Sequence, residues 1–149
     1  MPHVEKSALV PFPAAQMFAL VDDVERYREF LPWCGGSAVS ERNELLTMAT
    51  ILIDYRGIRQ SFTTRNLKYG TETMEIHLVE GPFKSLEGVW RFQPLSDSAC
   101  KISLALEYRF ASPVLEKAIG PVFGMIAGTM IERFVARADA LFARNASPA

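Results

Sequence analysis

Hydrophobic and polar residues alternate with a period of two through the middle of the chain, from about residue 37 to residue 110. The alternation is clearest near its end, where Ile102, Leu104, Leu106, Tyr108 and Phe110 alternate with Lys101, Ser103, Ala105, Glu107 and Arg109. This period indicates strands with one dry and one solvated face. Residues 46–55, 58–67, 74–78 and 86–92 also read as strands. Their short connections predict a mainly antiparallel meander.

Turn signals separate these strands. Arg56-Gly57 is typical of a tight hairpin, Gly81-Pro82 predicts a corner, and residues 94–98 predict a turn. The segment Lys68-Tyr69-Gly70-Thr71 is expected to break the chain before the next strand, and Gly35-Gly36 is expected to loosen it before the sheet.

The first part of the chain predicts a strand and two short helices. Residues 4–10 read as a strand that ends at Pro11 and Pro13, and Pro13 suits the first turn of a helix over residues 14–21. Asp22 followed by Glu25 resembles a capping box for a second helix over residues 24–30. Pro32 then stops that helix.

A long helix is predicted from Pro113 to about residue 143, with Ser112 as its N-cap. Apolar residues recur at three- and four-residue spacing on one face: Ile119, Phe123, Ile126, Met130, Phe134, Ala138 and Leu141. Gly120-Pro121 is expected to bend its early part, and residues 144–149 to form a frayed tail.

These elements predict an α+β fold in a single domain over residues 1–149, with its core in about 4–143. A sheet with one dry face needs a cover, and the long helix is the largest element available. We therefore expect a helix-grip arrangement, in which a curved antiparallel sheet of about six to seven strands wraps around the C-terminal helix. Such an arrangement can leave a pocket between the sheet and the helix.

Composition narrows the classes of partner. Hydrophobic residues make up 49% of the chain and charged residues 22%, and the net charge is −1. A strongly basic field is therefore absent, and we expect no DNA partner. The two cysteines, Cys34 and Cys100, show no metal-ligand spacing and are expected to be free thiols. We see no signal-peptide or transit pattern, and no apolar run as long as a membrane span.

The sequence shows no catalytic constellation and no metal site. His77 lies on a predicted strand without a second ligand at metal spacing. No nucleophile-elbow motif and no phosphate-binding loop occur. Acid–base roles for Asp54, Tyr55 or Glu107 stay open, because one carboxylate or phenol in a pocket leaves no spacing signature.

Aromatic and methionine residues are numerous enough to line a cavity for an apolar ligand. The candidate ligand residues are Leu31, Pro32, Trp33, Phe62, Leu78, Phe83, Leu86, Trp90, Leu104, Phe123, Ile126, Met130 and Phe134. Trp33 and Phe83 stand at two corners of the chain, and we expect both to border the same cavity.

Four motifs occur in order: Asp23-Val24-Glu25-Arg26-Tyr27 with Phe30-Leu31-Pro32-Trp33-Cys34, then Phe62-Thr63-Thr64-Arg65-Asn66, then Gly81-Pro82-Phe83 with Leu86-Glu87-Gly88-Val89-Trp90, and then Phe134-Val135-Ala136-Arg137-Ala138. Together they resemble the coenzyme Q-binding START-like proteins of the polyketide cyclase/dehydrase superfamily, over about residues 4–142. The resemblance implies a helix-grip fold, in agreement with the pattern of strands and helices. It carries over no catalytic residues.

The resemblance implies two different activities. Some members bind ubiquinone or a related polyprenyl lipid in support of respiration. A bacterial toxin of the family is described as binding the large ribosomal subunit and blocking subunit association. Our first hypothesis is therefore an apolar-ligand protein whose cavity holds ubiquinone or a related polyprenyl lipid, with no cofactor required.

Two alternatives stay open. The first is a ribosome-directed toxin, for which Arg56, Arg59, Arg65 and Lys68 form a candidate basic patch. The second is a cyclase- or aromatase-like enzyme that would use an acid–base group in the cavity. We expect a bacterial cytoplasmic protein, with peripheral contact to the inner membrane as a further possibility.

Overall fold

The computed structural model describes residues 3–143. Seven strands form one antiparallel sheet in the order β1-β7-β6-β5-β4-β3-β2. They are β1 (His3–Val10), β2 (Cys34–Arg42), β3 (Leu46–Tyr55), β4 (Ile58–Tyr69), β5 (Thr73–Glu80), β6 (Phe83–Ser96) and β7 (Ala99–Phe110). The frayed tail predicted for residues 144–149 lies outside the described residues.

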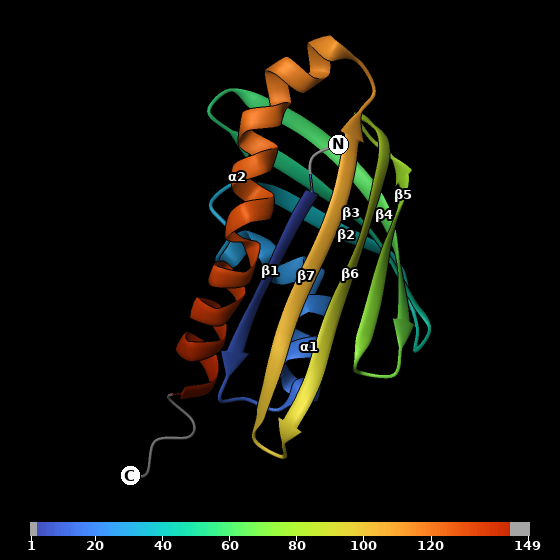
Figure 1. The fold of residues 1–149 in the computed structure, drawn as a ribbon. Coiled ribbons are helices and arrows are strands. Elements are labelled where there is room, and N and C mark those ends of the chain that lie inside the picture. Colours follow the sequence, from blue (N-terminus) through green and yellow to red (C-terminus); the bar gives the residue numbers. More distant parts are fainter. Residues whose placement is uncertain (1–2, 144–149) are drawn as a thin grey trace.

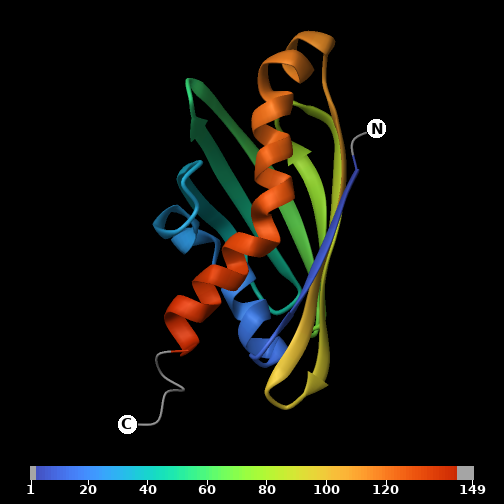
Figure 2. The ribbon, with the colours of Figure 1, turned by 60° about the vertical axis from the view of Figure 1, so that its left-hand side comes forward.

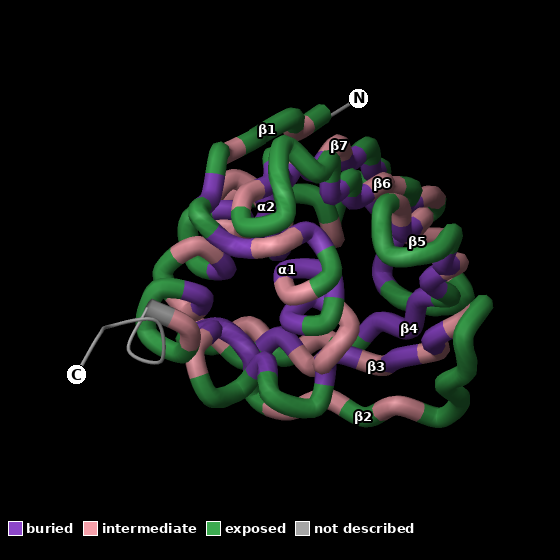
Figure 3. Tube along the Cα trace, turned by 90° about the horizontal axis from the view of Figure 1, so that it is seen from below, coloured by how far each residue is buried: buried purple, intermediate pink, exposed green. Residues whose placement is uncertain are grey.

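The sheet curves around a long helix, α2 (Pro113–Ala138), as Figure 1 and Figure 2 show. The short helix α1 (Ala14–Asp22) and the 3₁₀ helix η1 (Val24–Glu29) lie on the same concave side. Buried positions gather on the sides of the strands and helices that face this interior (Figure 3). The predicted helix-grip fold is therefore confirmed.

Helix α2 begins as its sequence predicts. The Ser112 hydroxyl accepts a hydrogen bond from the Leu115 amide at 3.2 Å, and Pro113 occupies the first turn. The α-helix ends at Ala138 and continues as a π-helical turn, η2 (Asp139–Ala143). A π turn changes the rotation per residue. Leu141 therefore leaves the apolar face on which the sequence placed it, and it is 37% exposed.

Several predicted breaks are instead parts of strands. Gly35-Gly36 lies in β2, at a bulge in its pairing with β3. Lys68 and Tyr69 continue β4. Pro94 lies inside β6, beyond Arg91, the last β6 residue paired with β5, so its missing N–H removes no bond on that side.

The two tightest predicted turns are confirmed. Arg56 and Gly57 both have positive φ, 50° and 83°, as a two-residue hairpin turn between β3 and β4 requires. Gly81 has φ 152°, and a Cβ at this position would lie 2.6 Å from the Cβ of Phe62. The corner between β5 and β6 therefore depends on glycine, both for conformation and for space.

The predicted capping box at Asp22 is wrong. Asp22 is the last residue of α1, and its carboxylate turns towards the sheet. It accepts hydrogen bonds from the Thr47 hydroxyl at 2.6 Å and from Lys68 Nζ at 3.2 Å. Arg42 donates to the Asp22 backbone carbonyl at 2.7 Å and forms a two-point ion pair with Glu25 at 2.7 and 2.8 Å. The Asp22 carboxylate does not cap η1, because the buried Lys68 ammonium is a stronger hydrogen-bond partner than the backbone amides of a 3₁₀ turn.

This polar cluster, Asp22 with Thr47, Lys68 and Arg42, joins the α1–η1 segment to three strands. The Lys68 side chain is only 5% exposed and that of Asp22 only 16%. A buried charge that loses its partner is costly, because it stays desolvated without compensation.

We expect Lys68→Met to lower the free energy of unfolding by about 1–3 kcal/mol, because Asp22 loses its buried cation while it keeps Thr47 and Arg42. Urea unfolding followed by circular dichroism measures this. The double variant Asp22→Asn/Lys68→Met should lose less than the sum of the two single variants. The control is Arg59→Met, which breaks the exposed pair with Asp54 and should change stability by less than about 1 kcal/mol. Equal losses of unfolding free energy in Lys68→Met and Arg59→Met would contradict a stabilising role of the polar cluster.

Candidate functional site

A small cavity lies between α2 and the concave face of the sheet, with a volume of about 70 Å³. It is lined by Val24, Tyr27, Trp33, Ile51, Phe62, Thr64, Asn66, Met74, Ile76, Leu86, Trp90, Leu104, Leu106, Phe123, Ile126, Ala127 and Met130. Almost all of these side chains are apolar, as in most ligand pockets. Ligand pockets usually measure about 300–1,000 Å³, so this one is small.

The cavity arises from the spacing of residues on α2. Phe123 packs against Phe83 and Tyr108, with ring centroids 4.8 and 4.7 Å apart. About three turns further on, Phe134 packs against Tyr27 and Trp90, each at 5.4 Å. Between the two phenylalanines, α2 presents Ile126, Ala127 and Met130 to the sheet. These side chains do not fill the space that the two ring clusters hold open.

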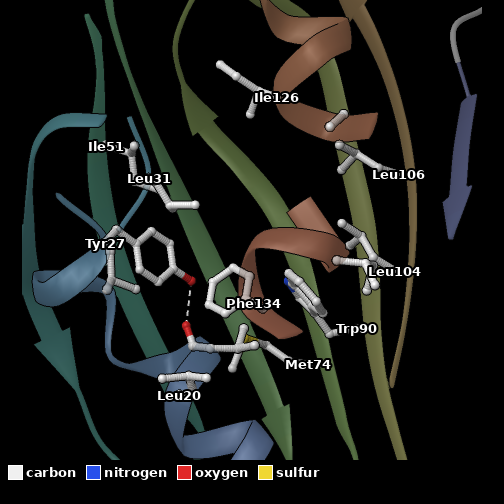
Figure 4. Packing of buried hydrophobic residues seen from close by; sticks show 14 of the residues in the cluster. Leu20, Tyr27, Leu31, Ile51, Met74, Trp90, Leu104, Leu106, Ile126 and Phe134 are labelled. Atoms are coloured by element: carbon white, nitrogen blue, oxygen red, sulfur yellow. Dashed lines mark hydrogen bonds between the residues drawn. The ribbon is translucent and has the colours of Figure 1, made fainter. Parts of the chain in front are cut away.

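Figure 4 shows the lower of these clusters, in which Phe134 of α2 lies between Tyr27 of η1 and Trp90 of β6. A dashed line marks the hydrogen bond that the Tyr27 hydroxyl donates to the Val21 carbonyl. The residues come from segments that are far apart in the sequence, so the site forms only when the sheet closes on the helix.

Eight of the thirteen predicted ligand residues line the cavity: Trp33, Phe62, Leu86, Trp90, Leu104, Phe123, Ile126 and Met130. The cavity lining does not include the other five, Leu31, Pro32, Leu78, Phe83 and Phe134. Pro32 is exposed and Leu78 half-buried, whereas Leu31, Phe83 and Phe134 are core residues. Contact of any of these residues with a ligand stays a prediction.

The expectation that Trp33 and Phe83 border one cavity is wrong for Phe83. Its ring lies one layer further out and contacts two lining residues, Phe62 at 5.8 Å and Phe123 at 4.8 Å. It also stacks on Phe110, the last residue of β7. The corner at Gly81 therefore places Phe83 behind the lining residues, where it supports them without touching the empty space.

Nine lining residues were missed from sequence: Val24, Tyr27, Ile51, Thr64, Asn66, Met74, Ile76, Leu106 and Ala127. Strand parity contained a signal for some of them. Thr64 and Asn66 follow Phe62 at steps of two on β4, so they share its inward face. Ile51 of β3 is the direct cross-strand partner of Phe62. The polar residues Thr64 and Asn66 on an otherwise apolar strand face could therefore have indicated that this face borders a cavity.

Five of the lining residues carry polar groups: Tyr27, Trp33, Thr64, Asn66 and Trp90. The Thr64 hydroxyl donates to the Asn66 side-chain oxygen at 3.0 Å. Burial raises the pKa of Tyr27 well above its usual range, and the Asp22 carboxylate raises it further, so the phenol keeps its proton. The indole N–H of Trp33 is buried and, among the described residues, has no hydrogen-bond partner. The cavity thus offers hydrogen-bonding groups but no ionised group.

The candidate acid–base residues lie outside this cavity. Asp54 pairs with Arg59 at 2.9 Å on the surface, and Glu107 is exposed on the outer face of the sheet. Tyr55 lies beneath the Arg56 guanidinium, 5.3 Å from its ring centroid. His77 meets Glu75 at 3.1 Å. Within residues 3–143, no group of three or more His, Cys, Asp or Glu is placed to hold a metal ion.

The predicted basic patch is only partly correct. Arg56, Arg59 and Arg65 are exposed along the β3–β4 hairpin and β4. Lys68 has the opposite parity on β4, so its side chain points inward to Asp22. Lys68 therefore cannot contact a partner on that surface.

The C-terminal helix is the one candidate membrane span among the described residues. The stretch Pro113–Phe142 is long and apolar enough to cross a bilayer by length and composition alone, and its 18-residue window has a mean hydropathy of 1.4. The sequence prediction concerned an unbroken apolar run, and the longest one in this stretch, residues 118–131, is shorter than a membrane span. A helix that covers the apolar face of a sheet passes the same test.

A curved antiparallel sheet around a long C-terminal helix, with an apolar cavity between them, defines a START-like helix-grip protein. Residues 10–135 match the family described as polyketide cyclase / dehydrase and lipid transport. The chain belongs to this family.

The chain is similar to named relatives over nearly its whole length. It is 44% identical to the ribosome association toxin RatA of Pseudomonas aeruginosa, over 94% of this chain and 97% of that protein. It is 24% identical to the mitochondrial coenzyme Q-binding protein COQ10 homolog B of Xenopus laevis, over 96% of this chain and 60% of that one. The aromatase/cyclase Zhui of Streptomyces sp. R1128 superposes with a TM-score of 0.80 at 16% identity, covering 95% and 97% of the two chains. That last likeness concerns the fold alone.

We expect Ala127→Val to raise the free energy of unfolding, because its methyl groups enter the cavity. Filling all 70 Å³ at about 24 cal/mol per Å³ would recover about 1.7 kcal/mol, and valine fills only part of this, so we expect about 1 kcal/mol. Urea unfolding measures the change. The exposed Ala118→Val on the same helix is the control for the lower helix propensity of valine. A loss in Ala127→Val larger than that of the control would show that the space does not exist in solution.

Proposed function

We propose that this protein associates with bacterial ribosomes in the cytoplasm, binds the large subunit and hinders subunit joining. The observation that carries the proposal is the 44% identity to a protein named ribosome association toxin, with nearly complete coverage of both chains. The sequence motifs alone favoured a lipid-binding function first and a ribosome-directed function second, and the proposal reverses that order.

The cavity volume supports this order. A space of about 70 Å³ is well below the ~300–1,000 Å³ of most ligand pockets, and it is too small for a quinone ring with an isoprenoid tail. In this conformation the protein is therefore not shaped as a loaded lipid carrier. Its activity as a ribosome-binding protein would instead reside on its surface.

The exposed arginines of the β3–β4 hairpin provide a candidate contact for ribosomal RNA. Arg56 and Arg65 form no ion pair among those found within residues 3–143, whereas Arg59 is paired with Asp54. Unpaired cations bind phosphates with release of counterions, so such binding weakens as salt rises. The net charge of −1 restricts this contribution to a local surface.

We expect excess purified protein to reduce the 70S peak and increase the free 50S and 30S peaks in sucrose gradients of a bacterial lysate. The variant Arg56→Glu/Arg65→Glu should bind 50S subunits more weakly, and its slope of log K against log salt should fall by about two, one per lost phosphate contact. The matched control is Lys101→Glu/Arg91→Glu, which reverses two exposed charges elsewhere on the outer face of the sheet. Unchanged peaks with the wild-type protein would end the ribosome proposal.

A second candidate function is the binding of an apolar ligand, including ubiquinone or a related polyprenyl lipid. It is supported by the apolar lining of the cavity, the lipid transport in the description of the family, and the coenzyme Q-binding name of one relative. Such a ligand requires the cavity to expand. The driving force would be burial of isoprenoid surface at about 25 cal/mol per Å².

If this second function holds, protein purified from quinone-replete cells carries a polyprenyl quinone. Organic extraction and mass spectrometry of the purified protein detect it, and native mass spectrometry gives its stoichiometry. The variant Ala127→Val, purified in parallel, should carry less, because its side chain occupies the cavity. Equal amounts in both proteins would show that the lipid binds elsewhere.

A further inference from the structure

The indole N–H of Trp33 is an unusual group in this fold. Trp33 follows η1, is 1% exposed, and lines the cavity. Its Nε1 atom is one of two buried side-chain nitrogen or oxygen atoms within residues 3–143 that have no hydrogen-bond partner. The other, Nε of Arg137, belongs to a guanidinium that already binds Glu29 at 2.6 Å. Trp33 has no such second donor.

A buried donor without a partner is disfavoured, since it has given up water and gained nothing in return. The aromatic ring of Trp33 could have been supplied by phenylalanine without this cost. The Trp33 side chain borders the cavity, but its Nε1 atom has almost no accessible surface. An acceptor atom that enters from the cavity would remove the cost once the neighbouring side chains shift to admit it.

The hydroxyls of Tyr27 and Thr64 and the side-chain oxygen of Asn66 already have partners. The amide N–H₂ of Asn66 and the indole N–H of Trp90 form no hydrogen bond among the described residues, but unlike Nε1 of Trp33 these atoms are not fully buried. The Tyr27 hydroxyl donates to the Val21 carbonyl, and the Thr64 hydroxyl donates to the Asn66 side chain. The lining contains no cation and no carboxylate. A ligand that uses the free N–H must therefore be neutral and largely apolar, with an acceptor oxygen at one end.

We infer that Trp33 is the polar anchor of the cavity, and that it selects apolar compounds that carry a carbonyl or ether oxygen over hydrocarbons of the same shape. This inference rests on the second candidate function, the binding of an apolar ligand. The present volume of about 70 Å³ admits only one end of such a ligand. Ile76 and Met130 are the two lining residues that are only half-buried, and the flexible methionine allows the wall to give way to the rest of the ligand.

The test uses the wild-type protein and two matched compounds. Acetophenone and cumene share a phenyl ring and differ in a carbonyl oxygen that cumene replaces with a methyl group. The chain contains two tryptophans, Trp33 and Trp90, so a ¹H–¹⁵N spectrum shows two indole N–H signals, which Trp90→Phe assigns. We expect acetophenone to move the Trp33 indole proton downfield and cumene to leave it in place.

Affinities provide the second measurement. Trp33→Phe should lower the preference for acetophenone over cumene by about tenfold, because the ketone loses a charge-neutral hydrogen bond. Trp90→Phe changes the other tryptophan of the lining and tests whether its indole N–H is the donor instead. Arg59→Met, at the exposed surface, should leave this preference unchanged within about twofold. Comparing the two compounds in each variant cancels their different solubilities in water.

Other outcomes would overturn the inference in distinguishable ways. Binding of both compounds with no shift of the Trp33 signal and equal preferences in all variants would refute the anchor while the cavity remains a ligand site. A changed preference in Trp90→Phe alone would assign the donor to Trp90 instead. Binding of neither compound would reject both the anchor and the second candidate function.

Discussion

The packing of α2 on the concave face of the sheet, through Phe123 and Phe134, is the interaction on which the rest of the structure depends. Each ring joins a cluster of aromatic side chains contributed by separate strands or by the η1 segment. Without this cover, the apolar face of β6 and β7 would face water. The same two contacts also set the height of the helix above the sheet, and so they determine where empty space remains.

The polar cluster around Asp22 fixes the position of the α1–η1 segment against the sheet. The chain leaves β1, forms α1 and η1, and must return to the sheet as β2. Asp22 and Lys68 tie the middle of this excursion to the far part of β4, and Arg42 ties it to β2. Since η1 supplies Val24 and Tyr27 to the cavity wall, the position of that wall follows from an ion pair outside it.

Much of the fold was predictable because local signals and burial agree. The alternation in β7 matches its burial at every second residue from Cys100 to Phe110. The hairpin at Arg56-Gly57 and the cap at Ser112 depend on short-range backbone geometry that sequence reveals directly. The errors occur where a distant partner overrides the local preference, as at Asp22, or where a neighbouring strand ends, as at Pro94.

The candidate site was predicted only in part for a related reason. The sequence by itself determined which residues are large, apolar and on an inward face, and this identified Trp33, Trp90, Phe123 and Met130. Only the tertiary structure decided which of them border empty space, because a cavity depends on the heights of facing side chains from different elements. It moved Phe83 and Phe134 into the supporting layer, added Thr64 and Asn66 to the lining, and left the N–H of Trp33 without a partner. Hydrophobic patterning specifies a face, whereas close packing specifies what that face leaves unfilled.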